Sequence, residues 1–196
     1  GYLVFHSRHC EHCLTQRHGE TTHYMHQVLE AKLLGPAHTV FSIATEFIDN
    51  RDTQGVAAGA SQEQVKQDCE LKALRRLMAG LRAEFPQVRL CLNGDSLYAC
   101  GEGFQVAKDY RCDFIYVFEP GRLPAVWKDF QGLLRLCPDQ SVELLTPQGV
   151  RQVYRWINGL CYTDSDGRDW SFHAIHCRET KGDREPTDSI LRRTAA

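Results

Sequence analysis

The hydrophobic pattern of the first 50 residues predicts three successive strands. The segments GYLVF (1–5), THYMHQVLEAKLLG (22–35) and HTVFSIATEFI (38–48) are rich in the β-branched and aromatic residues typical of strands. Gly35 and Pro36 break the pattern between the second and third segments. We therefore expect an N-terminal sheet, with the polar segment between the first two strands as a loop.

A four-residue apolar repeat predicts a long amphipathic helix over 65–85. Ser61 and Gln64 have the spacing of a capping box at its start, and Pro86 predicts its end. The apolar stripe consists of Val65, Cys69, Ala73, Leu74, Leu77, Met78, Leu81 and Phe85. The opposite face is most simply solvated, but it also offers candidate contacts to DNA phosphates, among them Lys72, Arg75 and Arg76.

The segment CLNGDSLYAC (91–100) has two interpretations. Asn-Gly between apolar runs is a strong hairpin signal, and it would make Asp95 a turn residue. Alternatively, the apolar run VRLCL is a strand between two helices, because the long helix precedes it and GEGFQVAKDY (101–110) begins another. Ligand sites in α/β sheets lie at the carboxyl ends of strands, which is where Asp95 would then stand. On this second interpretation the strand is central and buried on both faces.

The segment from 112 to 180 alternates between apolar and polar residues, which indicates a β-rich region. Asn158-Gly159 lies between two alternating runs and predicts a hairpin. Three tryptophans are expected to pack in the core or, alternatively, to stack on an unpaired base: Trp127, Trp156 and Trp170.

Composition narrows the function classes. The chain has 196 residues, 42% of them hydrophobic, and a formal net charge of −2, so contact with nucleic acid would depend on local patches. We expect one domain, or one domain with an insertion, that is soluble and cytoplasmic, since no apolar run suits a membrane span or a signal peptide. The chain opens at Gly1 with its first Met at Met25, as a piece of a longer protein would.

A His- and Cys-rich stretch at 6–26 predicts a zinc site. Cys10 and Cys13 form CxxC, and His23 and His26 form HxxH, which together offer two thiolates and two imidazoles to tetrahedral Zn²⁺. The spacing is shorter than in a classical finger, and other histidines compete as ligands: His6, His9, His12 and His18. The alternative is a polar loop with reduced, unligated cysteines, as the other seven, scattered singly through apolar segments, should also be.

Several motifs occur together in an order that resembles a known family. They are HCEHCL, YMHQVL, TEFI, KQDCELKALRRL, FPQVRLCLNGDSLYA, YRWINGLCY and CRETK. Over residues 1–182 the chain resembles the DDE-type transposases of bacterial insertion sequences. The resemblance implies an RNase H-like α/β fold, a mixed sheet with flanking helices and a β-rich insertion. We expect core elements over 1–111, the remaining core and insertion over 112–182, and an atypical tail, truncated or frameshifted, over 183–196.

The resemblance implies that Asp95 is a catalytic carboxylate that holds Mg²⁺ or Mn²⁺ for cutting and joining DNA. The family's first catalytic Asp would precede this chain, and its catalytic Glu finds no match after Lys181, while Glu179 is a strand residue. We therefore expect a transposase fragment that is inactive alone, whose partners are transposon ends, target DNA and further copies of itself, near the bacterial nucleoid. The alternatives are a zinc-binding nucleic-acid or protein-interaction module and an inactive transposase remnant.

Overall fold

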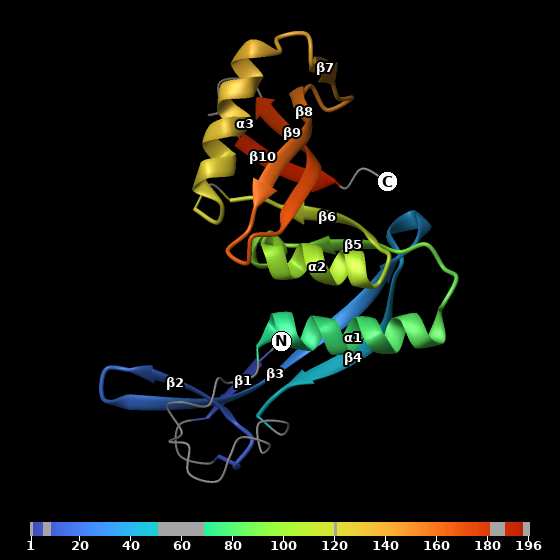
Figure 1. Ribbon diagram of the computed structural model, residues 1–196. Coiled ribbons are helices and arrows are strands. Elements are labelled where there is room, and N and C mark those ends of the chain that lie inside the picture. The colour runs from blue at the N-terminus through green and yellow to red at the C-terminus, as the bar shows by residue number, and fades with distance from the viewer. Residues whose placement is uncertain (1, 6–8, 51–68, 120, 181–186, 194–196) are drawn as a thin grey trace. The chain divides into compact units, whose positions relative to one another are not determined.

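The chain has an α/β architecture, seen in a computed structural model that describes residues 2–5, 9–50, 69–119, 121–180 and 187–193 (Figure 1). The first and last of these ranges are described by their backbone. The chain divides into two compact units, Gly1–Gln87 and Val88–Ala196. The boundary falls before the strand that precedes Asp95, whereas we expect from the sequence that this strand belongs to the same core as residues 1–87.

The N-terminal unit is built around one long strand. β3 (Thr21–Leu34) pairs antiparallel with β1 (Tyr2–Phe5), β2 (Leu14–His18) and β4 (Val40–Ile48). The three predicted strands are confirmed, but the predicted loop before β3 contains β2 as a fourth. Gly19 and Glu20 close this extra hairpin, with Gly19 at φ 61°, and a Gly-containing two-residue loop is the sequence signal that indicates such a turn.

The helix α1 (Glu70–Glu84) packs against β3 and β4. Its buried residues confirm the middle of the predicted apolar stripe: Ala73, Leu74, Leu77, Met78 and Leu81. Cys69 and Phe85, also predicted in the stripe, are exposed, and Val65 lies outside the described residues. Ala73 forms a small core cluster with Leu14 and Ile48, and β3 adds Met25 and Leu29 to it. The helix ends at Glu84, with Phe85 as its C-cap directly before Pro86, as predicted. Its predicted start at residue 65 is wrong, because Cys69 has extended backbone and is the N-cap. The expected capping box at Ser61 and Gln64 lies outside the described residues.

The C-terminal unit contains a six-stranded sheet in the order β5-β6-β10-β9-β8-β7. β5 (Cys91–Gly94) and β6 (Asp113–Val117) are parallel and are joined through η3 (Ser96–Tyr98) and α2 (Gly101–Asp109). Then follow α3 (Pro124–Leu136), β7 (Ser141–Leu145), β8 (Arg151–Thr163), β9 (Asp169–Thr180) and β10 (Thr187–Arg193). The strands from β6 to β7 along the sheet are paired antiparallel.

The strand before Asp95 is half of a parallel pair. Residues 91–94 align with 113–116 of β6, so the hairpin interpretation of Asn93-Gly94 is wrong and the α/β interpretation is confirmed. The expectation of a central, doubly buried strand is wrong. β5 is the outermost of the described strands in its sheet, and its residues are exposed or half-buried. The resemblance also implies one mixed sheet that contains both the first strand and the Asp95 strand, and this expectation is wrong, because β1 and β5 belong to different sheets.

Asn158-Gly159 does not form the predicted hairpin. Both residues lie inside β8, where the register with β9 shifts between Ile157 and Leu160. Gly159 has φ 66°, which is the backbone conformation that places glycine in a bulge as readily as in a turn. The bulge changes which side chains of β8 face each side of the sheet.

Aromatic side chains fill the core of the C-terminal unit. Phe104 of α2 packs against Phe114, Tyr116 and Phe172, with ring centroids 5.2–6.2 Å apart. Burial raises the pKa of Tyr116 above its ordinary value.

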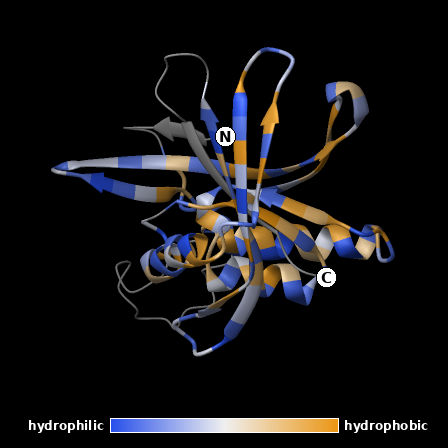
Figure 2. Cartoon of the chain, turned by 90° about the horizontal axis from the view of Figure 1, so that it is seen from above, coloured by the Kyte–Doolittle hydropathy of each residue, from blue (hydrophilic) through white to orange (hydrophobic). Residues whose placement is uncertain are grey.

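In Figure 2 the apolar segments gather in the helices and the strands they cover, whereas the hairpin of β2 and β3 is mainly hydrophilic. None of the helices within the described ranges is long and apolar enough to cross a bilayer.

Candidate functional site

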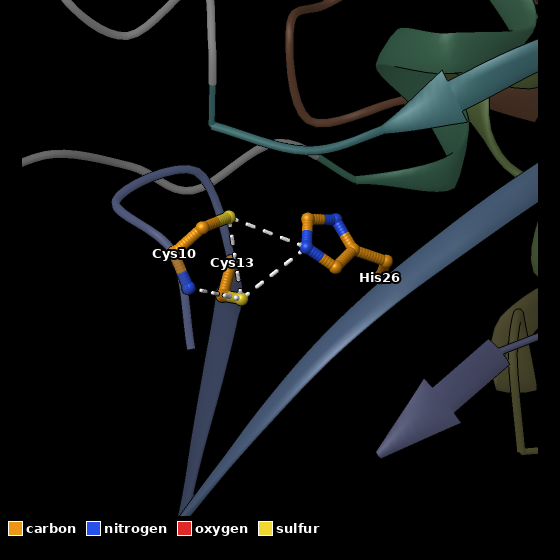
Figure 3. A group of neighbouring side chains, drawn as sticks. All are labelled: Cys10, Cys13 and His26. Atoms are coloured by element: carbon orange, nitrogen blue, oxygen red, sulfur yellow. Dashed lines mark hydrogen bonds between the residues drawn. The ribbon is translucent and has the colours of Figure 1, made fainter. Parts of the chain in front are cut away.

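Three potential metal ligands converge at one end of the β2/β3 hairpin (Figure 3). The Sγ atoms of Cys10 and Cys13 are 3.7 Å apart. The Nε2 atom of His26 lies 3.4 Å from the Sγ of Cys10 and 3.3 Å from the Sγ of Cys13. This triangle is the one group of three or more such ligands found among the described residues.

Strand register and a tight turn build the group. Leu14 stands opposite Met25 in the β2/β3 pairing, so the next position outward places Cys13 opposite His26. Cys10 then reaches the same point through a turn in which the Cys13 amide donates to the Cys10 carbonyl at 3.3 Å. The Cys10 amide in turn donates to the Cys13 sulfur at 3.4 Å, which favours a thiolate there.

Asn50, just beyond β4, holds this turn in place. Its amide nitrogen donates to the carbonyl of His12 at 3.0 Å, and its side-chain Nδ2 donates to the carbonyl of Cys13 at 3.0 Å. These bonds connect the CxxC turn to the end of a strand more than 35 residues later. The turn is therefore tied both to the start of β2 and to the end of β4, which gives its sulfurs fixed positions.

The triangle has the dimensions of one face of a zinc tetrahedron. With Zn–S near 2.3 Å and Zn–N near 2.0–2.1 Å, tetrahedral angles put two sulfurs about 3.8 Å apart and a sulfur and a nitrogen about 3.5 Å apart. The separations of 3.7, 3.4 and 3.3 Å lie within a few tenths of an ångström of these values. Burial raises the pKa of the Cys13 thiol, so a bound cation would be needed to keep it ionised near neutrality.

His23, the fourth predicted ligand, is not part of this group. Side chains alternate between the faces of a strand, so His23 and His26 of β3 point to opposite faces. The ring of His23 lies instead beside that of His18, with centroids 4.9 Å apart. The HxxH pair was predicted by spacing alone, and the alternation of the same predicted strand excludes it.

The competing histidines do not complete the group either. His9 stacks on Tyr24 with ring centroids 3.9 Å apart, and His12 lies 3.4 Å from the carboxylate of Glu11. His6 lies outside the described residues. Within the described part of the chain, Zn²⁺ would therefore have three protein ligands, Cys10, Cys13 and His26, and a fourth position for another donor.

Asp95 lies at the carboxyl end of β5, as predicted, and is exposed. It is the N-cap of η3, where its Oδ1 accepts a hydrogen bond from the Leu97 amide at 2.9 Å. No group of three metal ligands in the described ranges includes it. Asp95 is therefore a single exposed carboxylate at the carboxyl end of β5, held in place by its bond to the Leu97 amide.

The basic face of α1 has a structural role at one of its three named positions. The Nε of Arg76 donates to the Glu46 carboxylate at 2.6 Å, and its Nη2 donates to the Phe47 carbonyl at 2.8 Å, which ties the helix to β4. Arg76 is half-buried, as is Arg75, while Lys72 is exposed.

Comparison with known proteins adds no assignment to this geometry. No family model matches the chain, and no curated protein matches it.

Proposed function

We propose that the chain is part of a DDE-type insertion-sequence transposase with an RNase H-like core, which cuts and joins DNA by metal-dependent phosphodiester transfer. The observation that carries the proposal is the position of Asp95. It follows a strand of a parallel β-α-β arrangement, at the end of the sheet where such enzymes place carboxylates. The ordered series of motifs around it supports the same family.

The chemistry requires more than Asp95. Its exposed carboxylate suits Mg²⁺ or Mn²⁺, which prefer oxygen ligands in an octahedral arrangement. One carboxylate fills only part of such a site, so other carboxylates and the DNA phosphate must supply the remaining oxygens. Asp95 would act by holding one cation beside the scissile phosphate, and the cation would stabilise charge on the attacking or leaving oxygen.

An excision assay tests this proposal. The complete reading frame that contains this chain would be expressed beside a marker flanked by the DNA ends that surround the gene. Excision should occur, and Asp95→Asn should abolish it. The matched control is Asp139→Asn, which changes an exposed aspartate in the turn after α3. Equal excision by Asp95→Asn and the unchanged protein would refute the catalytic assignment.

A second proposal concerns the N-terminal unit: that Cys10, Cys13 and His26 hold a structural Zn²⁺, which would make this unit a zinc-binding module. The ligand triangle and its match to tetrahedral dimensions support it. The ion would join the CxxC turn to β3 by bonds much stronger than the hydrogen bonds already there. This proposal is compatible with the first, since a structural zinc and a catalytic magnesium use different ligands.

Two histidines on one strand give the zinc proposal a matched test. His26→Ala should lower zinc content and remove the thiolate-to-metal absorption of the Co²⁺-substituted protein. His23→Ala, on the opposite face of β3, should leave both unchanged. Equal loss from both variants would mean that the HxxH pair binds together, and unchanged metal content in both would leave the group a set of reduced, unligated side chains.

A further inference from the structure

A pocket of about 480 Å³ lies in the C-terminal unit between α3 and the strands β8 and β9. This volume is within the range of small-molecule sites. Ten residues line it: Trp127, Phe130, Gln131, Leu134 and Arg135 from α3, Arg151, Val153 and Arg155 from β8, and His176 and Arg178 from β9. All belong to a single compact unit.

The pocket combines an apolar helix face with a basic strand face. Positions 151, 153 and 155 of β8 share one face of the strand, and Arg155 stands opposite His176 in the register with β9. From α3, residues spaced three or four apart reach the same space, among them Trp127 and Phe130, whose ring centroids are 6.0 Å apart. The sequence pattern that encodes the basic side is the alternation RQVYR at 151–155.

Positive charge is concentrated here in a chain whose formal net charge is −2. Four arginines and a histidine line the pocket, and no carboxylate is among the described lining residues. Like charges this close raise one another's energy, and an anion in the pocket relieves that repulsion. The chemistry of the lining is therefore that of an anion site.

The arginines differ in what already engages them. Arg151 donates twice to Glu143, at 2.6 and 2.7 Å, and Arg178 also has an interaction partner within the protein. Arg155 donates one of its five N–H groups to the Leu134 carbonyl, and Arg135 is an exposed residue in the last turn of α3. Arg135 and Arg155 are thus the arginines best able to donate hydrogen bonds to a bound anion.

We infer that this pocket binds the sugar-phosphate backbone of a single DNA strand, an inference that rests on the proposed function in DNA transposition. Arginine guanidinium groups are the preferred donors to phosphate oxygens. The pocket is larger than a lone phosphate requires, and Trp127, Phe130 and Val153 provide an apolar wall against which a sugar or base can pack. A phosphate joined to an apolar body fits both halves of the lining.

The test is the binding of a dye-labelled single-stranded DNA oligonucleotide to the purified full chain, followed by fluorescence anisotropy over a range of salt concentrations. Arg135→Gln and Arg155→Gln should each weaken binding about tenfold, because each removes a charge-assisted contact. Each should also reduce the slope of log affinity against log salt by about 0.7. Arg135→Lys should restore the slope. The control is Arg89→Gln, which removes the same charge from an exposed arginine that pairs with the half-buried Asp113 outside the pocket.

Each outcome bears on the inference. Normal DNA binding by both pocket variants would overturn it while leaving the proposed function to the excision assay. Failure of the unchanged chain to bind DNA would also overturn it. Displacement of the oligonucleotide by inorganic phosphate at the same concentration of phosphate groups would assign the pocket to a free anion and not to DNA. Arg135 is exposed, so its variant keeps the test valid if Arg155→Gln destabilises the unit.

Discussion

The two compact units bury their apolar side chains to different extents. In the C-terminal unit, Phe104, Tyr116, Phe130 and Phe172 are each no more than 1% exposed. In the N-terminal unit the buried apolar side chains among the described residues are mainly those of α1, with Leu14 and Ile48, and none of them is aromatic. Large apolar residues of β3 and β4 remain in solvent: Leu33, Leu34, Val40, Phe41 and Phe47, each more than half exposed. Large aromatic side chains contribute most of the hydrophobic stabilisation in a core of this kind.

The difference bears on the zinc site proposed for the N-terminal unit. A core without large aromatic side chains gains less from burial, and a bound metal is a common additional source of stability in small units. The Cys10, Cys13 and His26 group lies beside this core, since Leu14 and Met25, the chain neighbours of Cys13 and His26, belong to the core cluster. The C-terminal unit, with its aromatic core, has no such need, and its functional candidates lie on its surface.

The largest effect should come from removing a zinc ligand. Cys13→Ser should abolish zinc binding and unfold the N-terminal unit, because zinc-binding free energies of about 10–16 kcal/mol in zinc fingers exceed the stability of most small domains. Metal analysis and amide hydrogen exchange measure this, and exchange in residues 88–180 should be unchanged. The control is Cys161→Ser, which alters an exposed thiol of the other unit. Retained protection of β2 and β3 in Cys13→Ser would show that the apolar core of this unit keeps it folded without zinc.

A substitution in the aromatic core should destabilise the C-terminal unit and leave the N-terminal unit unchanged. Phe104→Ala should lower the free energy of unfolding of the C-terminal unit by about 3–5 kcal/mol, because it leaves a cavity among Phe114, Tyr116 and Phe172. Zinc content should stay the same. Urea unfolding measures the loss, with Leu136→Ala as the control, since Leu136 is 77% exposed. A loss as small as that of the control would contradict the aromatic core.

The next largest effect should be the loss of stability of the C-terminal unit in acid, to which Asp164 contributes. Desolvation raises the pKa of Asp164, but hydrogen bonds from Trp170 Nε1, the Arg168 side chain and the backbone amides of residues 166 and 168 outweigh it and lower the pKa to about 2. The folded pKa lies below the unfolded value of 3.8, so this stabilisation is present above about pH 4 and is lost as pH falls toward 2.

Urea unfolding of the C-terminal unit across this pH range measures the effect. Stability should decline below about pH 4, and Asp164→Asn should flatten the decline. A zinc ion held as proposed should leave the N-terminal unit at a pH above this range, because metal ligands must be deprotonated to bind. An unchanged pH profile in Asp164→Asn would mean that other carboxylates govern the acid limb.

The smallest effect on stability should come from Asp95→Asn. An asparagine Oδ1 still accepts the hydrogen bond from the Leu97 amide, so the free energy of unfolding should change by less than about 0.5 kcal/mol. Thermal unfolding of both proteins measures this. A large loss of stability would make Asp95 a structural residue, and any loss of excision would then need no catalytic explanation.

Local pattern in the sequence determined much of the fold. The apolar repeat of α1, the strands β1, β3 and β4, and the strand before Asp95 all follow from side-chain periodicity and from breakers such as Pro86. The CxxC turn is likewise local, since two residues three apart can meet without any distant contact. The exclusion of His23 from the ligand group can also be predicted locally, because side-chain alternation along the predicted strand puts His23 and His26 on opposite faces.

Only the tertiary structure decided which elements meet. The register of β2 with β3 places Cys13 opposite His26, and the pairing of β8 with β9 makes Asn158-Gly159 a bulge. Contacts between distant segments also place β5 next to β6, at the edge of the described strands of its sheet. They likewise bring α3 against β8, which forms the arginine pocket. Such pairings are selected by the burial and hydrogen bonding of the whole sheet, and a local window of sequence carries no information about a strand's neighbour.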